Sequence, residues 1–485
     1  MVFRLFFAIF AGMKKLWLIL AMMLQLSMVR AEIKITVLSD IHVMSPELVV
    51  KDGKAWQDFL AQKRVMLDLS KQLFDEEVER LLKEKPDMVL ITGNLTKDGE
   101  VKSHECVVTQ LDRLREAGIK VYVIPGDHDL GTEKAFIYNG DETSMAETVD
   151  ANQFASLYQM YGYGSDSTRD PYSLSYACEP FKGLVLIGIE TDRRAVMAES
   201  TLEWVCEQAE KARSEGKQVL AMMHPLLFPH VVNIDRLNKD YLVKDYETVR
   251  NRLADAGIRV VLTGHMHVLE MAKDYNADLS APIYEVITAS LAAYPCAYRH
   301  LTLNSDLSKL SITTDYVKTL SGYEDFQGMA KERLTKSISV VYANEFNMET
   351  GTDLVAQGFV IHAEGNENDS DDAKTFQALY ELTQLILRLS GALNDKLASH
   401  GLTWTDVNNS VRGMLTDTSS YGNAARENQT DDLQLTIEMP EVSSASAIKS
   451  TRVENTDEGY YTLQGIRVKS PQKGLYIRNG KKVVR

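Results

Sequence analysis

Cysteine is scarce in this chain, with four residues among 485. They are scattered along the sequence, at Cys106, Cys178, Cys206 and Cys296. Because none has a second cysteine at metal-ligand spacing, the pattern argues against a thiolate metal centre. We expect four buried free thiols. One or two disulfides are the alternative in an oxidising compartment, and the sequence does not fix their pairing.

Positive charge is also in deficit. The chain has 53 Lys and Arg residues against 68 Asp and Glu residues, so its net charge is −15. Such an acidic chain repels the backbone of long nucleic acid, and we expect no partner of that kind. A small phosphoester remains compatible, because bound metal ions supply local positive charge. The length suggests two or three domains.

The N-terminal apolar run, residues 16–28, is short for a membrane span. It follows Lys14 and Lys15, and Val29-Arg30-Ala31 ends in a small residue that suits cleavage. We therefore predict a signal peptide over residues 1–31 and an exported protein, periplasmic, at the cell surface or secreted. The mature protein would have no transmembrane span. The alternative is an uncleaved membrane anchor.

Five apolar runs that predict buried strands each end in residues able to bind metal. Functional side chains of α/β sheets gather at such strand ends. Because these ends hold five of the ten histidines, they predict a site for two metal ions and phosphoester chemistry. The segments are Asp40-Ile41-His42, Gly93-Asn94, Gly126-Asp127-His128-Asp129, His224-Pro225 and Gly264-His265-Met266-His267.

The order of these segments resembles the pattern D-x-H, G-D, G-N-H-D/E, H, G-H-x-H of the calcineurin-like metallophosphoesterases. Further similarity continues to about Val317. The resemblance implies an α/β fold, a four-layer αββα sandwich over residues 32–320. It also implies two metal sites that share residue 94: one with Asp40, His42, Asn94 and His267, the other with Asn94, Asp127, His224 and His265.

The chemistry of such a site follows from its donors. Imidazole and carboxylate without thiolate favour Mn, Fe or Zn over Mg. The resemblance implies that two such ions generate hydroxide, which attacks the phosphorus of a phosphomonoester or phosphodiester directly. His128 is not expected to bind metal. By the resemblance it contacts phosphate or protonates the leaving oxygen, and Asp129 orients its ring.

Two positions depart from the family pattern, and the departures are related. The second segment has Asn94 where relatives have Asp, and the third has Asp127 where they have Asn. The formal charge of the ligand set is therefore unchanged. Since an amide oxygen is a neutral and poorer bridge between two cations, we expect Asp127 to take part or all of the bridging role.

Segments with helical periodicity alternate with the predicted strands, and this alternation ends after Gly322. We expect helices within residues 56–85, 107–117, 203–214, 246–256 and 373–397, the last with an apolar stripe that belongs to a core. Residues 321–440 would form a smaller, mostly helical domain. The acidic segment 364–372 before its long helix is expected to be a solvated loop, with a calcium loop as the alternative.

The C-terminal end has a different composition. Residues 441–459 are polar and serine-rich, which predicts a linker, and residues 460–485 predict short strands with a tight turn at Asn479-Gly480. This tail resembles the C-terminal sorting tails of secreted bacterial proteins, which implies a secretion machinery as partner. The alternative is a simple C-terminal β-hairpin.

Substrate contacts are less visible in the sequence. The tyrosine-rich segment 136–176, with Tyr158, Tyr161 and Tyr163, and the segment 228–246 either line the mouth of the site or simply pack as loops. His104 is expected to pack near the start of a helix. No motif surrounds the remaining histidines, so they are given no role: His230, His300, His362 and His400.

Three functions fit these observations. The first is an exported metal-dependent phosphoesterase. The second is an extracellular nucleotidase, which needs an aromatic platform for a base. The third is a catalytically weakened binding protein on the same scaffold, for which Asn94 is the best support; the retained His128-Asp129 pair and the other histidines count against it.

Overall fold

The computed structural model describes residues 31–230, 240–346, 352–365 and 431–442, short pieces between 374 and 406, and four strands beyond residue 459. The predicted signal peptide lies outside the described residues except for Ala31. Most of the predicted helix at 373–397, most of the predicted loop at 364–372 and most of the linker at 441–459 also lie outside them. The chain divides into two compact units, and the smaller contains Val442–Arg485.

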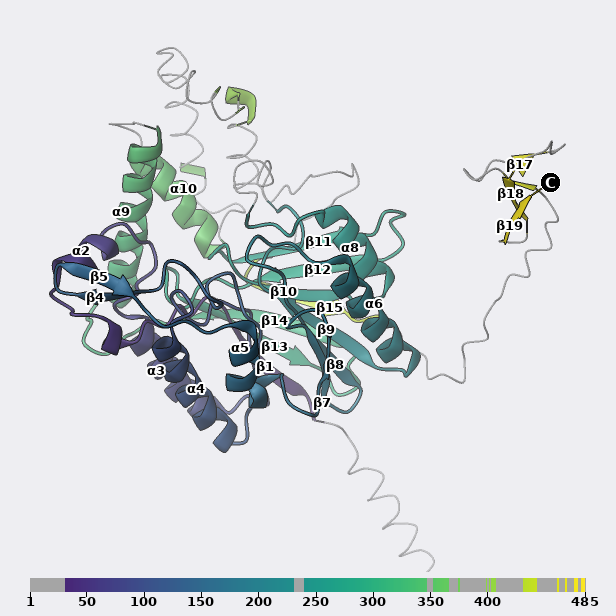
Figure 1. Cartoon of the computed structure of the whole chain (residues 1–485), viewed down its shortest axis with the longest axis horizontal. Helices are drawn as coiled ribbons and strands as arrows, with labels where there is room; N and C mark the ends of the chain where they lie inside the picture. Colours follow the sequence, from purple (N-terminus) through teal and green to yellow (C-terminus); the bar gives the residue numbers. More distant parts are fainter. Residues whose placement is uncertain are drawn as a thin grey trace, which may run out of the picture. The chain divides into compact units, whose positions relative to one another are not determined.

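The larger unit is built on two mixed sheets (Figure 1). The first has the strand order β15-β14-β13-β1-β2-β3, and the second has the order β11-β12-β10-β9-β8-β7-β6. The first sheet comprises β1 (Ile33–Leu38), β2 (Met88–Ile91), β3 (Lys120–Val123), β13 (Ala297–Leu303), β14 (Lys309–Tyr316) and β15 (Gln434–Glu438). The second comprises β6 (Thr168–Arg169), β7 (Tyr176–Phe181), β8 (Leu184–Ile189), β9 (Gln218–Met223), β10 (Val260–Thr263), β11 (Glu270–Tyr275) and β12 (Pro282–Ile287).

Parallel pairing brings the ends of the ligand-bearing strands together. In the first sheet β1 pairs with β2 and β2 with β3, with Leu38 opposite Ile91 and Ile91 opposite Val123. In the second sheet β9 and β10 are also parallel neighbours. The residues that follow β1, β2 and β3 therefore emerge at one sheet edge, and those that follow β9 and β10 emerge at one edge of the other.

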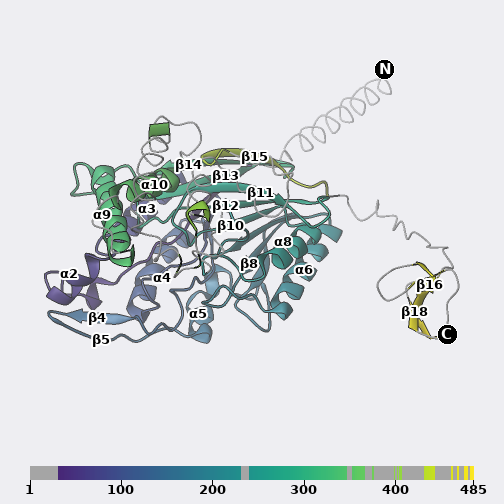
Figure 2. The same ribbon diagram turned by 90° about the horizontal axis from the view of Figure 1, so that it is seen from above.

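Helices cover the outer faces of the two sheets, as the two views show (Figures 1 and 2). Helices α3 (Ser70–Glu84) and α4 (Val101–Glu116) lie on the first sheet, and α6 (Glu199–Ser214) and α8 (Tyr246–Asp255) lie on the second. Their buried apolar faces, such as Leu73, Phe74, Val78 and Leu81 on α3, recur every three or four residues. The resulting four-layer αββα sandwich confirms the predicted fold.

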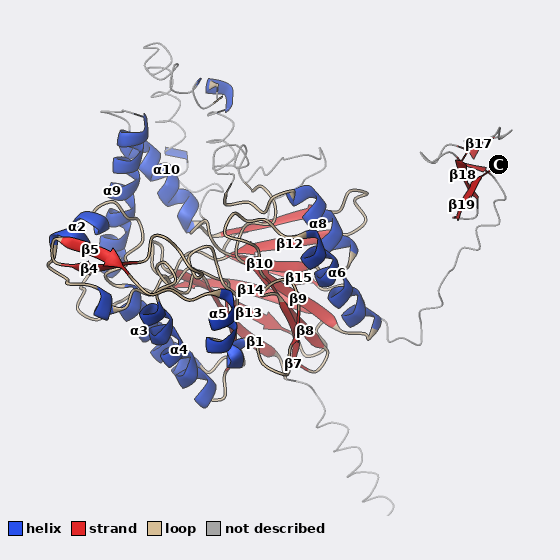
Figure 3. Ribbon diagram, in the orientation of Figure 1, coloured by secondary structure: helices blue, strands red, loops and turns tan. Residues whose placement is uncertain are grey.

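Smaller elements complete the first half of the chain. The remaining helices there are η1 (Pro46–Leu48), α2 (Lys54–Leu60), α5 (Ala151–Leu157) and η2 (Gln159–Tyr161). A separate hairpin joins β4 (Phe136–Asn139) to β5 (Glu142–Met145) and packs on α2, as the contact between Tyr138 and Trp56 shows (Figure 3).

All four cysteines are free thiols. Cys178, Cys206 and Cys296 are buried, as expected from the sequence, whereas Cys106 is only partly buried.

The region after residue 320 is joined to the sandwich. Helices α9 (Phe326–Phe346) and α10 (Thr352–Glu364) share an apolar cluster with Met266 and Val268, next to the predicted metal ligands. Arg333 of α9 forms two hydrogen bonds with Asp68, at 2.7 and 3.0 Å. Strand β15 pairs with β14 along five residues. The segment 321–440, which we expected to form its own domain, therefore contributes an edge strand to the first sheet.

The smaller unit contains a four-stranded sheet of order β17-β16-β18-β19. Its strands are β16 (Tyr460–Tyr461), β17 (Arg467–Val468), β18 (Leu475–Arg478) and β19 (Lys481–Val484). Arg478 pairs with Lys481, the register of a two-residue hairpin connection. In the whole described part of the chain, no helix is both long and apolar enough to cross a bilayer.

Candidate metal centre

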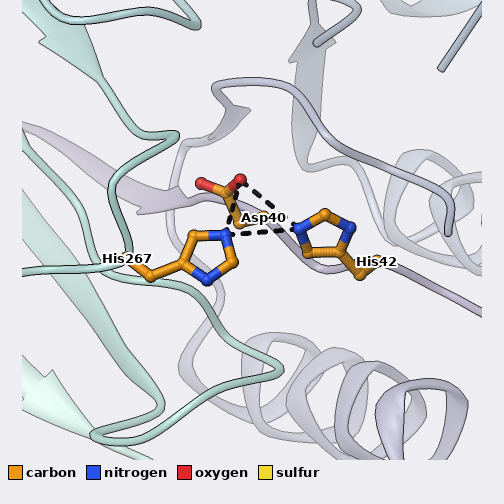
Figure 4. A group of neighbouring side chains, drawn as sticks. All are labelled: Asp40, His42 and His267. Atoms are coloured by element: carbon orange, nitrogen blue, oxygen red, sulfur yellow. Dashed lines mark hydrogen bonds and ion pairs between the residues drawn. The ribbon is translucent and has the colours of Figure 1, made fainter. Parts of the chain in front are cut away.

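The predicted ligands form two groups at the strand ends. Asp40, His42 and His267 make the first group (Figure 4), and Asp127, His224 and His265 make the second. Within each group the potential ligand atoms all lie within 4.8 Å of one another. Six of the seven residues predicted as ligands are thus placed in two three-residue sets.

In the first group, nitrogen and oxygen atoms converge on one point (Figure 4). His267 Nε2 lies 3.2 Å from Asp40 Oδ1 and 3.3 Å from His42 Nε2. Burial lowers the pKa of His42, and burial together with the charge of Arg64 lowers the pKa of His267 to about 3. Both imidazoles are therefore neutral near pH 7, which is the form that binds a metal.

The second group is oriented by backbone carbonyls. Thr92 O lies 2.7 Å from His224 Nδ1, and Asp240 O lies 3.3 Å from His265 Nε2, so each of these nitrogens donates its hydrogen there. The other two ring nitrogens lie 2.9 Å apart beside Asp127 Oδ1. A cation between these three atoms would offset the repulsion of their lone pairs.

A proton can fill that place in the metal-free chain. Burial lowers the pKa of His224, but the charges of Asp40 and Asp127 and the hydrogen bond to Asp127 outweigh it and raise the pKa above its ordinary value. The pKa values of both carboxyls are held well below their usual range by the neighbouring histidines, against the effect of burial. The donor set thus fits divalent metal ions held by imidazole and carboxylate.

The backbone at the ligands is unusual. Five of them have positive φ: Asp40 (48°), His42 (43°), Asn94 (52°), His265 (66°) and His267 (64°). Asn, Asp and His tolerate this left-handed region better than most residue types. Such local strain persists only where the surrounding structure enforces it, and it is concentrated at functional sites.

The motif glycines make room for the ligands. A Cβ on Gly93 would lie 2.6 Å from His224 Nδ1, and one on Gly264 would lie 2.7 Å from Asp40 Oδ2. Both distances are too short for a real side chain, so any other residue would displace a ligand.

Asn94 lies between the two groups as a hydrogen-bond donor. Its Nδ2 donates to Asp40 Oδ1 at 2.9 Å and to Asp127 Oδ1 at 3.1 Å, while its Oδ1 accepts from the backbone N–H of His128 at 3.0 Å. To offer oxygen to a metal, the amide would have to turn over and lose the bond to His128. The ligand role of Asn94 stays a prediction that requires this rearrangement.

Asp40 is the carboxylate that reaches both groups. Its Oδ1 lies 3.2 Å from His267 Nε2 and 3.8 Å from His224 Nε2. Asp127 Oδ1, in contrast, contacts the two histidines of its own group at 3.2 and 3.3 Å. The expectation that Asp127 takes part or all of the bridging role stays a prediction, and Asp40 is the carboxylate with an oxygen within 4 Å of histidines from both groups.

His128 lies beside the second group and is held by a residue that the sequence did not identify. Its Nδ1 lies 2.8 Å from Asp98 Oδ1 and 2.7 Å from Lys97 O. Burial lowers the pKa of His128, but the hydrogen bond to Asp98 and the charges of Asp127 and Asp98 outweigh it and raise the pKa to about 9. The ring can therefore carry a proton to a leaving oxygen.

Asp129 has a different role from the one predicted. Its carboxylate accepts backbone N–H groups from Leu95 at 3.0 Å, Thr96 at 2.9 Å and Gly126 at 2.8 Å. It ties the second and third ligand segments together. The expectation that Asp129 orients the His128 ring is wrong, because its oxygens are committed to these loops and Asp98 holds the ring.

The two groups open on a cleft of about 1060 Å³. Among its lining residues are five cations, Lys63, Arg64, Lys97, Lys134 and Arg193, and the aromatic residues Phe59, Phe136, Tyr138 and Tyr241. Most of these come from α2, the segment after it and the β4–β5 hairpin. Sequence reasoning missed α2 and its flank, since nothing in residues 54–64 marks them as close to the ligands.

The tyrosines considered as substrate contacts lie elsewhere. Tyr158, Tyr161 and Tyr163 belong to the main apolar core, so they pack the fold. His104 is buried and links Tyr158 Oη (2.7 Å from Nδ1) to Asp129 O (3.0 Å from Nε2). Its predicted packing role is confirmed, and it supports the loop that carries Asp129.

Comparison of the sequence with protein families agrees with this geometry. Residues 33–269 match the family profile described as calcineurin-like phosphoesterase. A probable glycerophosphodiester phosphodiesterase, GpdQ, from Arcobacter nitrofigilis is 25% identical over 232 residues, which cover 46% of this chain and 69% of that protein. A dimetal phosphatase from Danio rerio aligns with a TM-score of 0.41 and 11% identity, over 58% of this chain and 95% of that one.

The ligand groups, the αββα sandwich and the profile match define the class of the protein: residues 33–269 belong to the calcineurin-like phosphoesterase family. The chain is a metal-dependent phosphoester hydrolase. Its two ligand groups suit two metal ions, and substrates of this family are small phosphoesters.

Proposed function

We propose that this protein is an exported phosphodiesterase that acts on a small phosphodiester. The observation that carries the hydrolytic part is the pair of ligand groups with His128 beside them at the cleft. Similarity to a probable glycerophosphodiester phosphodiesterase supports a diester over a monoester. A cleft of about 1060 Å³ has room for substituents on both sides of a phosphate.

The residues of the site have separate tasks. Asp40, His42 and His267 would hold one metal ion, and Asp127, His224 and His265 the other. When bound, these ions would supply Lewis acidity to the phosphoryl oxygens and to an attacking water. His128, fixed by Asp98, holds a proton at Nε2 for the leaving oxygen. Manganese, iron and zinc all suit this donor set.

The cationic side of the cleft recruits the substrate. Burial lowers the pKa of Lys63, and the nearby charges of Lys97 and Lys134 act in the same direction, against the charge of Asp98. Lys97 is paired with Asp98, whereas Lys63 and Lys134 are exposed to solvent. In a chain with net charge −15, this local excess of positive charge favours an anionic ligand.

A nucleotide ester is the second candidate. Phe59 and Tyr241 are partly exposed on the cleft wall, and Tyr241 lies 4.6 Å from the His265 ring. An aromatic ring so near the metal ligands supplies the stacking surface that a nucleotidase needs.

The test uses the mature full chain loaded in turn with Mn, Fe or Zn. We expect bis(4-nitrophenyl) phosphate to be hydrolysed faster than 4-nitrophenyl phosphate, and Asp40→Asn to abolish both rates. Faster hydrolysis of the monoester would revise the ester class, and a preference for nucleoside esters lost in Tyr241→Ala would favour the nucleotidase. Two bound metals without hydrolysis of any ester would overturn the proposal in favour of a binding protein.

Export rests on other observations. Residues 1–31 have the pattern of a signal peptide. Residues 460–485 resemble a sorting tail, and on that basis we propose a secretion machinery as partner. N-terminal sequencing of the protein from the medium or the cell envelope tests this proposal. Recovery of the unprocessed chain in the cytoplasm alone would refute it.

A further inference from the structure

A third group of potential ligands lies away from the catalytic centre. His230, Glu270 and His362 offer two ring nitrogens and a carboxylate oxygen that lie within 4.8 Å of one another. The ligand atoms of each catalytic group lie within the same distance of one another. The exposed fractions of the three residues are 1%, 3% and 1%, so no substrate has access to them.

His230 has polar atoms that the described protein does not satisfy. Both of its ring nitrogens are buried without a hydrogen-bond partner among the described residues. Leaving such a group buried and unpaired costs about 1–3 kcal/mol, so proteins rarely do it. A cation that accepts the lone pair of the unprotonated nitrogen would give this ring a partner.

The charges near the group permit a cation. Burial and the neighbouring His362 lower the pKa of His230, and burial lowers the pKa of His362 to about 4, so both rings are neutral. Glu270 and Asp432 are buried carboxylates whose charges act on the buried Arg299. Two negative charges and one positive charge leave a net −1, which attracts a divalent ion.

The two rings lie against each other. The His230 and His362 rings are stacked with centroids 5.6 Å apart and an angle of 20° between their planes. Next to them, Leu269 N donates to Ala363 O at 3.3 Å, which fixes the neighbours of Glu270 and His362 side by side. The backbone bond therefore already brings two of the three ligands together.

We propose that His230, Glu270 and His362 bind a structural zinc ion. Two imidazoles and one carboxylate suit zinc, whereas Mg²⁺ and Ca²⁺ prefer oxygen ligands alone. The ion would join three segments that are distant in sequence: the loop six residues after the catalytic ligand His224, the start of β11 three residues after His267, and helix α10. It would fasten the C-terminal helices to the catalytic domain.

The first test is zinc stoichiometry. The full chain, equilibrated with zinc and freed of loosely held metal, is expected to bind three ions by elemental analysis. His230→Leu and His362→Leu should each bind two, while the control His300→Leu, on β13 outside all three groups, should bind three. If the two histidines were only packing residues, leucine would leave the stoichiometry unchanged, and that result would overturn the proposal.

The second test locates the ion without a substitution, and it decides the matter if the leucine variants do not fold. Crystals of the wild-type chain grown with zinc are measured on both sides of the zinc absorption edge. An anomalous peak within about 2.3 Å of the two ring nitrogens and the carboxylate is expected. Peaks at the catalytic groups alone would overturn the proposal.

Discussion

Asn94 Nδ2 lies 2.9 Å from Asp40 Oδ1, and the same nitrogen lies 3.1 Å from Asp127 Oδ1. The amide therefore holds the carboxylates of the two ligand groups together from the position where relatives carry the bridging acid. An amide donor offsets part of the repulsion between two buried acids, which a third carboxylate would increase.

The first prediction concerns this exchange. Asp127→Asn should lose one metal ion and most activity, because the second group then contains no anionic ligand. Asn94→Asp should bind metal more tightly than the wild type but unfold more readily when metal-free, since three carboxylates would then meet. The double variant should recover much of what Asp127→Asn loses, because contacting ligands are not additive.

Metal stoichiometry, turnover and chelator-dependent melting temperature of the four proteins check this prediction at one metal concentration. A harmless Asp127→Asn, or a double variant no better than it, would show that the exchange is not compensatory and that the second site is degenerate.

The second prediction separates His128 from its neighbours. His128→Ala should lower turnover about 10²–10⁴-fold with metal content nearly intact, since the ring acts on the leaving group. Asp98→Asn removes the hydrogen bond and charge that raise the pKa of His128, so the pKa should fall. Because the acid acts in its protonated form, the alkaline limb of the pH–rate profile should then move to lower pH.

Asp129→Asn is the matched control for Asp98→Asn. It should destabilise the ligand loops without the same shift of the profile, because Asp129 binds backbone N–H groups. An unchanged profile in Asp98→Asn, or loss of metal in step with activity in His128→Ala, would contradict these roles.

The third prediction tests the cations of the cleft. Lys63→Ala and Lys134→Ala should each raise KM for an anionic ester about two- to fivefold with little change in kcat, as exposed charges contribute about 0.5–1 kcal/mol. The effect should shrink at high salt. Lys83→Ala, an exposed lysine of α3 outside the cleft, is the control. Equal kinetics in all three variants would remove the recruitment role.

The fourth prediction is a pH dependence of stability. Burial raises the pKa of Glu285 to about 7, against hydrogen bonds from Leu227 N, Thr263 Oγ1 and Phe228 N. Because the pKa of Glu285 is higher in the folded chain, its protonation contributes fully to stability below the unfolded-chain pKa near 4.5. This contribution is lost as the pH rises through the folded-chain pKa of about 7.

Glu285→Gln should remove this titration. Between pH 4.5 and pH 8, the free energy of unfolding of the wild type should fall by about 3 kcal/mol relative to that of Glu285→Gln. The titration of all other groups is common to both proteins and cancels in the comparison. Denaturant unfolding of both proteins across this range measures the difference. A constant difference would mean that Glu285 titrates alike in the folded and unfolded chain.

The fifth prediction concerns the tail. Its strands belong to a compact unit distinct from the one that contains the ligand groups. Deletion of residues 460–485 should therefore change where the protein accumulates and leave its specific activity unchanged. Activity per bound metal and cell fractionation check the two parts, and loss of activity in the truncated protein would tie the tail to catalysis.

The sequence predicted the site better than its surroundings. Asp40 and Asn94 follow neighbouring strands of the first sheet, so parallel pairing brings them to one edge, and the packing of the two sheets brings them close to His267 of the second. Asp98 lies 30 residues from His128, and no periodicity links the two. The role of Asp129 was wrong because adjacency in sequence does not show which loop an Asp side chain faces.

Tertiary contacts that the sequence does not show also explain the other differences between the predicted and the observed structure. Tyr158 and its neighbours were candidate substrate contacts by composition, but tertiary packing placed them in the core. Strand β15 was included in a mostly helical segment, since five residues of alternating character are a weak signal until β14 offers an edge.

That late strand has a consequence for how the protein is made. β14 ends at Tyr316 and its partner β15 begins at Gln434, so β14 stays the unpaired edge strand of the first sheet while more than a hundred further residues are synthesised. An open edge is a template for pairing between chains. Shortened versions that stop before Gln434 would keep every catalytic ligand but leave β14 without its partner, so the practical boundary of the enzyme lies beyond Glu438.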